Sequence, residues 1–257
     1  MRIKDKAAIV TGGASGLGKA TAQALIAKGA RVALFDLNAE LGRQVAAELG
    51  HGTISMPVNV ADPAAVDRAV EGVLAAFGTL HVVANCAGIG GSQRIMGKDG
   101  LVSPEWFTRI VNVNLVGTFN LIRATVPALS KNAPEATGER GVYINTASIA
   151  AFDGQIGQAA YSASKGGIVS MTLTLAREFA DNGIRVMSIL PGIFDTPLLG
   201  TLPDAARERL SKQVPFPARL GDVQEFAALA VHIVENPYLN GEAIRLDGAL
   251  RMGFGRK

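Results

Sequence analysis

The residues best suited to proton transfer in this sequence are Tyr161 and Lys165, within the stretch QAAYSASKGG at 158–167. On a helix, side chains four residues apart share a face about one turn apart. An unperturbed phenol has a pKa of about 10, and a nearby ammonium without a neighbouring acid favours the phenolate. We therefore predict that Lys165 lowers the pKa of Tyr161, which then serves as a general acid and base.

Two other polar residues accompany this pair. Ser148 ends the apolar run GVYINTAS, where its hydroxyl can hydrogen-bond a substrate oxygen, and Asn114 lies inside the apolar segment VNVNLVG. Taken singly, Ser148 is more simply a helix cap or turn residue and Asn114 a satisfied interior amide. Beside the Tyr-x-x-x-Lys pair, we interpret both as members of one catalytic group.

The elements that position these residues alternate along the chain. Seven short apolar runs, each followed by turn residues, predict strands that are covered on both faces: 7–12, 31–36, 53–58, 80–88, 141–148, 185–192 and 242–248. Helix-length segments separate them, for example 16–28, 63–77 and 104–130. This order predicts an α/β fold, a single-domain Rossmann-type doubly wound parallel sheet of about seven strands, with its ligand crevice at the carboxyl ends of the strands.

A glycine-rich turn, TGGASGLG at 11–18, follows the first predicted strand. Gly12, Gly16 and Gly18 allow the backbone to approach a pyrophosphate at the start of a helix. A triphosphatase loop would need Ser or Thr after Lys19, where the chain has Ala20. Asp36 ends the second strand, where a carboxylate can accept from ribose hydroxyls and repel a 2′-phosphate, so we expect NAD, although an ordinary turn Asp is the plainer interpretation.

Composition excludes several classes of function. The chain has 257 residues and a formal charge of +3, and its basic residues are scattered, so we expect no nucleic-acid partner. With one cysteine, Cys86, and three histidines without ligand spacing, we expect no disulfide and no metal site. No run approaches the roughly 18 apolar residues of a membrane span, so we expect a cytoplasmic protein without membrane contact.

We find no linker, and predict one domain over residues 1–257. Three stretches have the polar, turn-rich or Pro-rich character of loops that are functional or disordered: 90–102, 131–140 and 193–220. The last follows Pro191-Gly192 and contains Ile193, Phe194, Leu198, Leu199 and Leu202, with Phe216 further on. We expect it to be a substrate-side flap in which Leu199 contacts an acyl chain; packing at a subunit interface is the alternative.

Several motifs together resemble the short-chain dehydrogenase/reductase family: TGxxxGxG at 11–18, NCAG at 85–88, Asn114, Ser148, YSASK at 161–165 and PGIFDT at 191–196. Longer stretches, among them QVPFPARLGD and ENPYLNGEAIRLDGALRM, closely resemble its type II 3-hydroxyacyl-CoA dehydrogenases, also called 17β-hydroxysteroid dehydrogenases type 10. The resemblance covers nearly the whole chain. It implies a tetrameric NAD enzyme of fatty acid metabolism that oxidises a secondary alcohol on an acyl-CoA.

The resemblance also implies individual roles. Tyr161 exchanges the proton with the substrate oxygen, Ser148 polarises that oxygen, Lys165 also holds the nicotinamide ribose, and Asn114 positions a relay water. Gln155 matches a substrate-side glutamine. Beyond the glycines of the turn, the implied cofactor contacts are Ser15, Leu17, Asp36, Asn59, Val60, Asn85, Cys86, Ala87, Gly88, Tyr161, Lys165, Pro191, Gly192, Phe194 and Thr196. Asn59 and Cys86 depart from the residues usual in the family, Asp and Asn.

Three alternatives remain open from the sequence. The same catalytic group serves a 3-oxoacyl-carrier-protein reductase and a steroid or short-chain alcohol dehydrogenase. A dinucleotide-binding scaffold without turnover has no physical need for Ser148, Tyr161 and Lys165 together, so we prefer an enzyme.

Overall fold

The computed structural model describes residues 1–98, 100–200 and 203–254. Its main sheet has seven parallel strands in the order β3-β2-β1-β4-β7-β8-β9. The strands are β1 Ala7–Thr11, β2 Arg31–Asp36, β3 Ile54–Pro57, β4 Val82–Asn85, β7 Gly141–Thr146, β8 Ile184–Pro191 and β9 Ala243–Leu246. The sheet that the apolar runs predict is confirmed, with each strand inside or close to its expected range.

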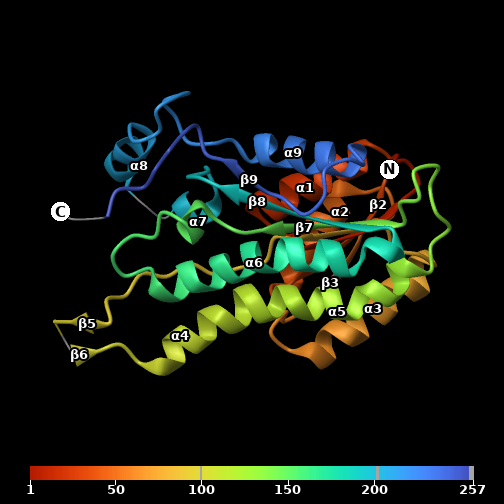
Figure 1. Ribbon diagram of the computed structural model, residues 1–257, viewed down its shortest axis with the longest axis horizontal. Coiled ribbons are helices and arrows are strands. Elements are labelled where there is room, and N and C mark those ends of the chain that lie inside the picture. The colour runs from red at the N-terminus through yellow and green to blue at the C-terminus, as the bar shows by residue number, and fades with distance from the viewer. Residues whose placement is uncertain (99, 201–202, 255–257) are drawn as a thin grey trace.

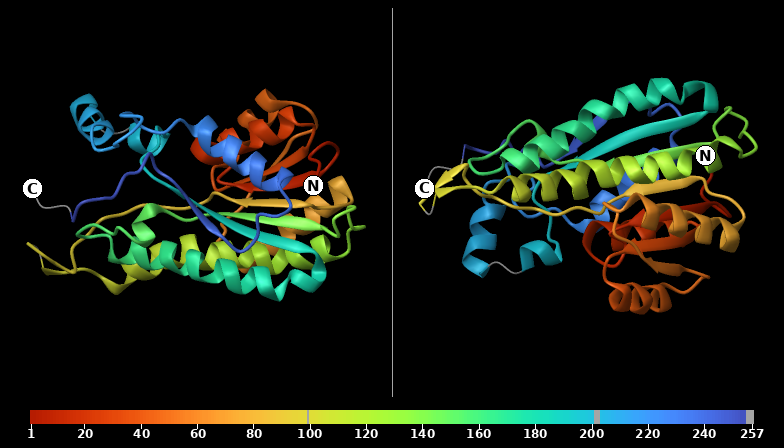
Figure 2. Two further views of the ribbon diagram at one scale, coloured as in Figure 1. Left: turned by 45° about the horizontal axis from the view of Figure 1, so that its top comes forward. Right: turned by 90° about the horizontal axis from the view of Figure 1, so that it is seen from below.

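Helices cover both faces of this sheet (Figures 1 and 2). One layer contains α1 Gly16–Ala27, α2 Ala39–Leu49 and α9 Val223–Glu235, and the other contains α3 Pro63–Phe77, α4 Pro104–Val111, α5 Gly117–Ser130 and α6 Ala159–Glu178. The strand order reverses between β1 and β4, the position where a doubly wound sheet opens its ligand crevice. No helix in the described ranges is long and apolar enough to cross a membrane.

Burial on both sides explains the continuous apolar runs. In β1, Val10 packs in the core beneath α1 and α9, whereas its neighbour Ile9 packs in the core beneath α3 and α5. Both side chains are fully buried. Complete burial of such a side chain contributes about 1.5–3 kcal/mol, which explains why apolar residues dominate these strands.

The predicted helix over 104–130 contains a break in its regular hydrogen bonding. Asn112–Val116 form a π-helical turn, η1, between α4 and α5. A π-turn adds a residue to the helical turn and often occurs at functional sites. Directly after it, Gly117 passes so close to Val60 that an added Cβ would lie 2.6 Å from Val60 Cγ2. The turn therefore rotates Asn114 inward while the helix packs tightly against the segment after β3.

Two of the three expected loops contain more structure than the sequence indicates. The hairpin β5 Met96–Gly97 and β6 Gly100–Leu101 lies within 90–102, and α7 Pro197–Gly200 and α8 Asp204–Ser211 lie within 193–220. Residues 201–202 of that segment, including Leu202, are outside the described residues. The remaining short elements are the 3₁₀ turns η2 Ile149–Ala151 and η3 Ala180–Asn182.

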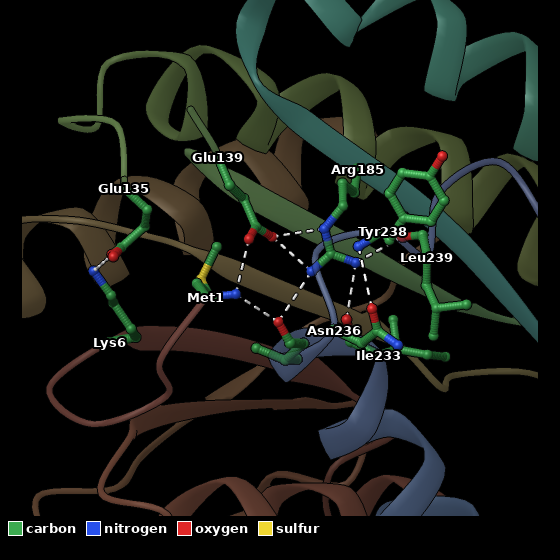
Figure 3. A network of polar contacts seen from close by, with 10 residues as sticks. Met1, Lys6, Glu135, Glu139, Arg185, Ile233, Asn236, Tyr238 and Leu239 are labelled. Carbon is green, nitrogen blue, oxygen red and sulfur yellow. Dashed lines mark hydrogen bonds and ion pairs between the residues drawn. The ribbon is translucent and has the colours of Figure 1, made fainter. Parts of the chain in front are cut away.

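The polar stretch 131–140 contains a buried charge. Glu139 is 4% exposed and receives hydrogen bonds from Arg185 of β8 and from the α-amino group of Met1, at 2.8 Å each (Figure 3). Arg185 also donates to the carbonyls of Ile233 and Val234 in the last turn of α9, a favourable place for a cation. Burial lowers the pKa of Arg185, and the Glu139 carboxylate opposes that shift. This network joins the loop before β7 to β8 and α9.

We predict that Glu139→Gln lowers the free energy of unfolding by about 2 kcal/mol, because it removes the charge-assisted partner of the buried Arg185. Urea unfolding followed by circular dichroism measures the effect. Glu135→Gln is the matched control, because Glu135 forms a more exposed ion pair with Lys6 (Figure 3), and such surface pairs contribute at most about 1 kcal/mol. Equal losses in the two variants would show that burial of the Glu139 charge does not matter.

Candidate active site

The glycine turn after β1 forms one side of the crevice. Gly12 and Gly16 have positive φ values of 61° and 49°. A Cβ at Gly18 would lie 2.1 Å from the Gly12 carbonyl oxygen, so the turn closes only with glycine there. The hydroxyl oxygen of Thr11 accepts hydrogen bonds from the backbone of Cys86 and Ala87, at 3.0 and 2.9 Å. Thr11 thus joins the ends of β1 and β4, a role that its place at the end of a strand could have indicated.

A cleft of about 900 Å³ opens along this turn, a volume suited to a nucleotide-sized ligand. Most of the cofactor residues implied by the resemblance line it: Gly12, Ser15, Gly16, Leu17, Gly18, Asp36, Asn59, Val60, Cys86, Ala87, Gly88 and Thr196. No motif in the sequence indicates the opposite wall, which includes Ile89, Glu105, Thr108, Arg109, Asn112 and Val113. Apart from Ile89, which follows β4, that wall comes from α4 and the π-turn.

The Asp36 carboxylate lies at the carboxyl end of β2 and lines this cleft. It accepts one hydrogen bond from Ala14 N at 3.1 Å and one from Asn38 N at 3.0 Å. An ionised carboxylate has about four acceptor sites, so capacity for ribose hydroxyls remains. Asn59 Oδ1 accepts from Ala61 N at 3.1 Å and also retains acceptor capacity. The glycine turn, the free acceptors and the cleft volume fit a dinucleotide.

Tyr161 and Ser148 form a hydrogen-bonded pair. Ser148 follows β7 and precedes η2, and its Oγ also accepts from Ala150 N at 3.1 Å. Lys165, one turn after Tyr161 on α6, is 4% exposed and donates to the Thr146 carbonyl at 2.7 Å. No ion pair involves Lys165 within the described part of the chain, so its ammonium is held by a neutral acceptor.

The pKa values of Tyr161 and Lys165 are both shifted by burial. Burial raises the pKa of Tyr161 above its usual range, and the hydrogen bond from Ser148 only partly opposes this shift. Lys165 Nζ lies 5.9 Å from the centre of the Tyr161 ring, and burial lowers the pKa of Lys165 to about 8. In the protein alone desolvation dominates; a lowering of the phenol pKa by Lys165 together with an oxidised nicotinamide stays a prediction. The phenol stays protonated, ready to act as an acid.

Asn114 lies in the π-turn and is fully buried. Its side chain pairs with both backbone groups of Ile89, accepting from N at 2.8 Å and donating to O at 3.0 Å, and also donates to Ser164 Oγ at 3.1 Å. A Cβ at Gly88 would meet Asn114 Oδ1 at 3.1 Å and Lys165 Nζ at 3.4 Å. Asn114 therefore fixes the segment after β4 close beside the Lys165 ammonium.

Other predicted residues lie apart from the cleft. Phe194 is 6% exposed and packs edge-on against Phe226 of α9, with ring centroids 6.4 Å apart, so its side chain belongs to the core and not to a flap. Asn85 Nδ2 donates to Asn145 Oδ1 at 2.8 Å between neighbouring strands. Gly192 N donates to the carbonyl of Leu246 at 2.9 Å.

Two predicted substrate residues have no contact that identifies a ligand. Gln155 Nε2 donates to the Gly253 carbonyl at 3.0 Å. Leu199 lies half-buried in α7. Phe216, which we expected in the same flap, is 82% exposed. The role of this segment in substrate binding stays a prediction.

Comparisons with known proteins agree with this geometry. The family described as short chain dehydrogenase matches residues 6–207. The chain is 51% identical to the 3-hydroxyacyl-CoA dehydrogenase type-2 of Rattus norvegicus, over 97% of each chain. Among solved structures, it resembles a 3-hydroxyacyl-CoA dehydrogenase type-2 from Mycobacterium avium, with a TM-score of 0.93, 39% identity and 97% of each chain covered.

A second solved structure is similar at lower identity. It is a 3-ketoacyl-(acyl-carrier-protein) reductase from Brucella melitensis complexed with NADH, with a TM-score of 0.87, 30% identity, and coverage of 97% of this chain and 100% of the other. The protein therefore belongs to the short chain dehydrogenase family and is an oxidoreductase.

Proposed function

We propose that this enzyme interconverts 3-hydroxyacyl-CoA and 3-oxoacyl-CoA with NAD as its cofactor. The observation that carries the proposal is the Ser148–Tyr161 hydrogen bond beside the buried Lys165, at the carboxyl ends of strands that also carry the dinucleotide cleft. The substrate class follows from the similarity to the rat enzyme along nearly the whole chain. Asp36, which places a negative charge where a 2′-phosphate would lie, favours NAD over NADP.

Each residue of the site has a distinct task in this proposal. Ser148 and Tyr161 both hydrogen-bond the substrate oxygen, and Tyr161 gives it a proton during reduction and removes one during oxidation. Lys165 holds the ribose hydroxyls with its ammonium, and Asn114 supports a water through which the phenol recovers its proton. When bound, the nicotinamide supplies or accepts the hydride, and its oxidised form adds a positive charge that stabilises the phenolate.

The assay that tests this function follows nicotinamide absorbance with a panel of substrates. We expect turnover with a short 3-oxoacyl-CoA and NADH, and lower kcat/KM with an acyl-carrier-protein thioester, a ketosteroid or a simple ketone. Higher kcat/KM for one of those three would assign the chain to the corresponding alternative. Saturable NADH binding without turnover of any substrate would identify a dinucleotide-binding scaffold.

Cofactor affinity should depend on pH through Lys165. Because burial lowers its pKa to about 8, the ammonium that holds the ribose is present below that pH and is lost above it. We predict that NADH affinity falls as the pH rises through 8, by at most about tenfold per pH unit. Fluorescence titration on both sides of pH 8 measures this change. Lys165→Met should bind NADH more weakly without that pH dependence, and an equal dependence in both proteins would contradict the assignment.

We also propose that the enzyme is a homotetramer and that helices α5 and α6 contribute to its interfaces. Val116, Phe119 and Leu173 are 37%, 46% and 45% exposed. The first two line an apolar groove with Leu115 and Met171, between α6 and the continuous segment of η1 and α5. Exposed apolar patches of this kind mark interfaces between proteins. The molar mass in solution, measured by light scattering, tests the proposal, and a monomer would refute it.

A further inference from the structure

The loop between Ser148 and Tyr161 has two parts that differ in how they are anchored. Ile149 and Ala150, directly after Ser148, are each 1% exposed and lie in the protein interior. Further along, Phe152 is 64% exposed and Ile156 is 42% exposed, so apolar packing holds this part weakly. Ser148 and Tyr161 lie at the two ends of this loop. The second part of the loop therefore needs another anchor if the relative position of the two side chains is to stay fixed.

An arginine from the last strand supplies this anchor. Arg245 of β9 donates from Nη1 to Asp153 Oδ1 at 3.2 Å and from Nη2 to Asp153 Oδ2 at 2.5 Å, a two-pronged pair. The Asp153 side chain is 14% exposed and that of Arg245 is 19% exposed. The pairing lowers the pKa of Asp153 and raises that of Arg245, so both are charged near neutral pH. Two parallel hydrogen bonds between the planar guanidinium and the carboxylate fix the relative orientation of the two side chains as well as their distance.

Arg245 is itself held in place by other groups. Its Nε donates to Asp247 Oδ2 at 2.7 Å, and its Nη2 also donates to the Leu250 carbonyl at 2.9 Å. Asp247 packs against the turn after β8, where a Cβ on Gly192 would lie 2.8 Å from Asp247 Cβ. The arginine therefore connects the loop after Ser148 with the turn after β8, both at the same edge of the sheet.

Residues near the end of the described chain also hydrogen-bond to the loop between Ser148 and Tyr161. Gln155 Nε2 donates to the Gly253 carbonyl at 3.0 Å, and Ile156 N donates to the Phe254 carbonyl at 3.3 Å. Asp153 also accepts a backbone hydrogen bond from Met252. The exposed half of the loop is thus bound on one side by residues that follow β9.

We propose that Arg245 and Asp153 are positioning residues, whose ion pair sets the geometry between Ser148 and Tyr161 without touching the substrate. This inference rests on the proposed catalytic roles of Ser148 and Tyr161. A displacement of about 1 Å in a catalytic group can lower the rate by about a hundredfold. Loss of the pair should therefore lower kcat, while the dinucleotide cleft, which neither Asp153 nor Arg245 lines, keeps its cofactor affinity.

The test compares Asp153→Asn, Arg245→Met and the double variant with wild type. We expect each single variant to lower kcat per NADH-binding site by about ten- to a hundredfold, with the dissociation constant for NADH changed less than about twofold. The double variant should lose no more than the larger single loss, because the two residues act through one contact. Asp153→Glu should recover part of the rate by restoring a carboxylate. Lys28→Met, which breaks the remote exposed pair with Glu235, is the matched control and should keep wild-type kcat.

A second measurement does not depend on turnover. The chain has three tyrosines, so isotope-labelled tyrosine gives few NMR signals, and Tyr161→Phe assigns the one from the site. The Tyr161 ring signal reports its hydrogen bond with Ser148. In Asp153→Asn it should move toward its position in Ser148→Ala, while the signal of the 97% exposed Tyr238 serves as reference.

The outcomes separate the two proposals. If wild type turns over none of the substrates, the proposed function fails, and the NMR signal alone decides the role of the ion pair. An unmoved Tyr161 signal, or kcat per binding site within about threefold of wild type in both single variants, would overturn the positioning role. Should either variant not fold, Arg245→Lys keeps the charge but not the planar fork, and an unchanged signal and kcat there would overturn it equally.

Discussion

Tyr161→Phe is expected to lower kcat by at least about a hundredfold, the usual contribution of a general acid and base, while NADH binding survives. The substitution keeps the half-buried ring and removes only the hydroxyl that hydrogen-bonds Ser148. Since burial already favours the protonated phenol, the variant loses a proton donor without losing a charge. Stopped-flow measurement of NADH oxidation separates the chemical step from product release.

Ser148→Ala and Lys165→Met give the controls for this result. Ser148→Ala should lower kcat with little change in NADH affinity, whereas Lys165→Met should damage both, because its ammonium also holds the ribose. Near-normal turnover in Tyr161→Phe would remove the proposed mechanism. A loss of NADH binding in the same variant would instead give the phenol a role in the cofactor site.

The order of the sheet could be predicted because each strand carries its own signal. Ile9 and Val10 point to opposite faces of β1, and both must be apolar when helices cover the two faces. The π-turn at Asn112–Val116 had no such signal, because NVNLV also fits a regular helix. Directly after it, Gly117 approaches Val60 closely, a contact between residues distant in sequence.

The candidate catalytic residues stand out in the sequence because chemistry restricts both their types and their spacing. Contacts between residues distant in sequence could not be predicted, because they form only in the folded chain. Glu139 lies in KNAPEATGER, where nothing distinguishes it from the more exposed Glu135, yet it alone is buried against Arg185. An apolar residue in a predicted loop gives the same sequence pattern whether it covers a ligand or packs in the core. The sequence therefore predicts Phe194 in a flap, whereas its side chain packs in the core. The pKa of Tyr161 depended on burial, which the spacing to Lys165 does not reveal.

Cofactor choice is the second large effect we predict. Asp36→Ala should weaken NADH binding by on the order of 1.5–3 kcal/mol, because it removes charge-assisted hydrogen bonds to the ribose. It should also bind NADPH more tightly than wild type, because the 2′-phosphate no longer meets a carboxylate. Fluorescence titration measures the two dissociation constants. Their ratio should change both because NADH binds more weakly and because NADPH binds more tightly. If wild type already used NADPH as well as NADH, the role assigned to Asp36 would be wrong.

Asp36 also has a structural task, and a second variant separates it from the electrostatic one. Its carboxylate accepts the Ala14 N–H of the glycine turn at 3.1 Å, so Asp36→Ala leaves that donor without its partner. Asp36→Asn keeps an oxygen for Ala14 N while removing the charge. If repulsion of the phosphate sets the preference, Asp36→Asn should gain NADPH affinity as Asp36→Ala does, yet lose less NADH affinity. If support of the turn sets it, Asp36→Asn should keep the wild-type preference, because the hydrogen bond to Ala14 survives.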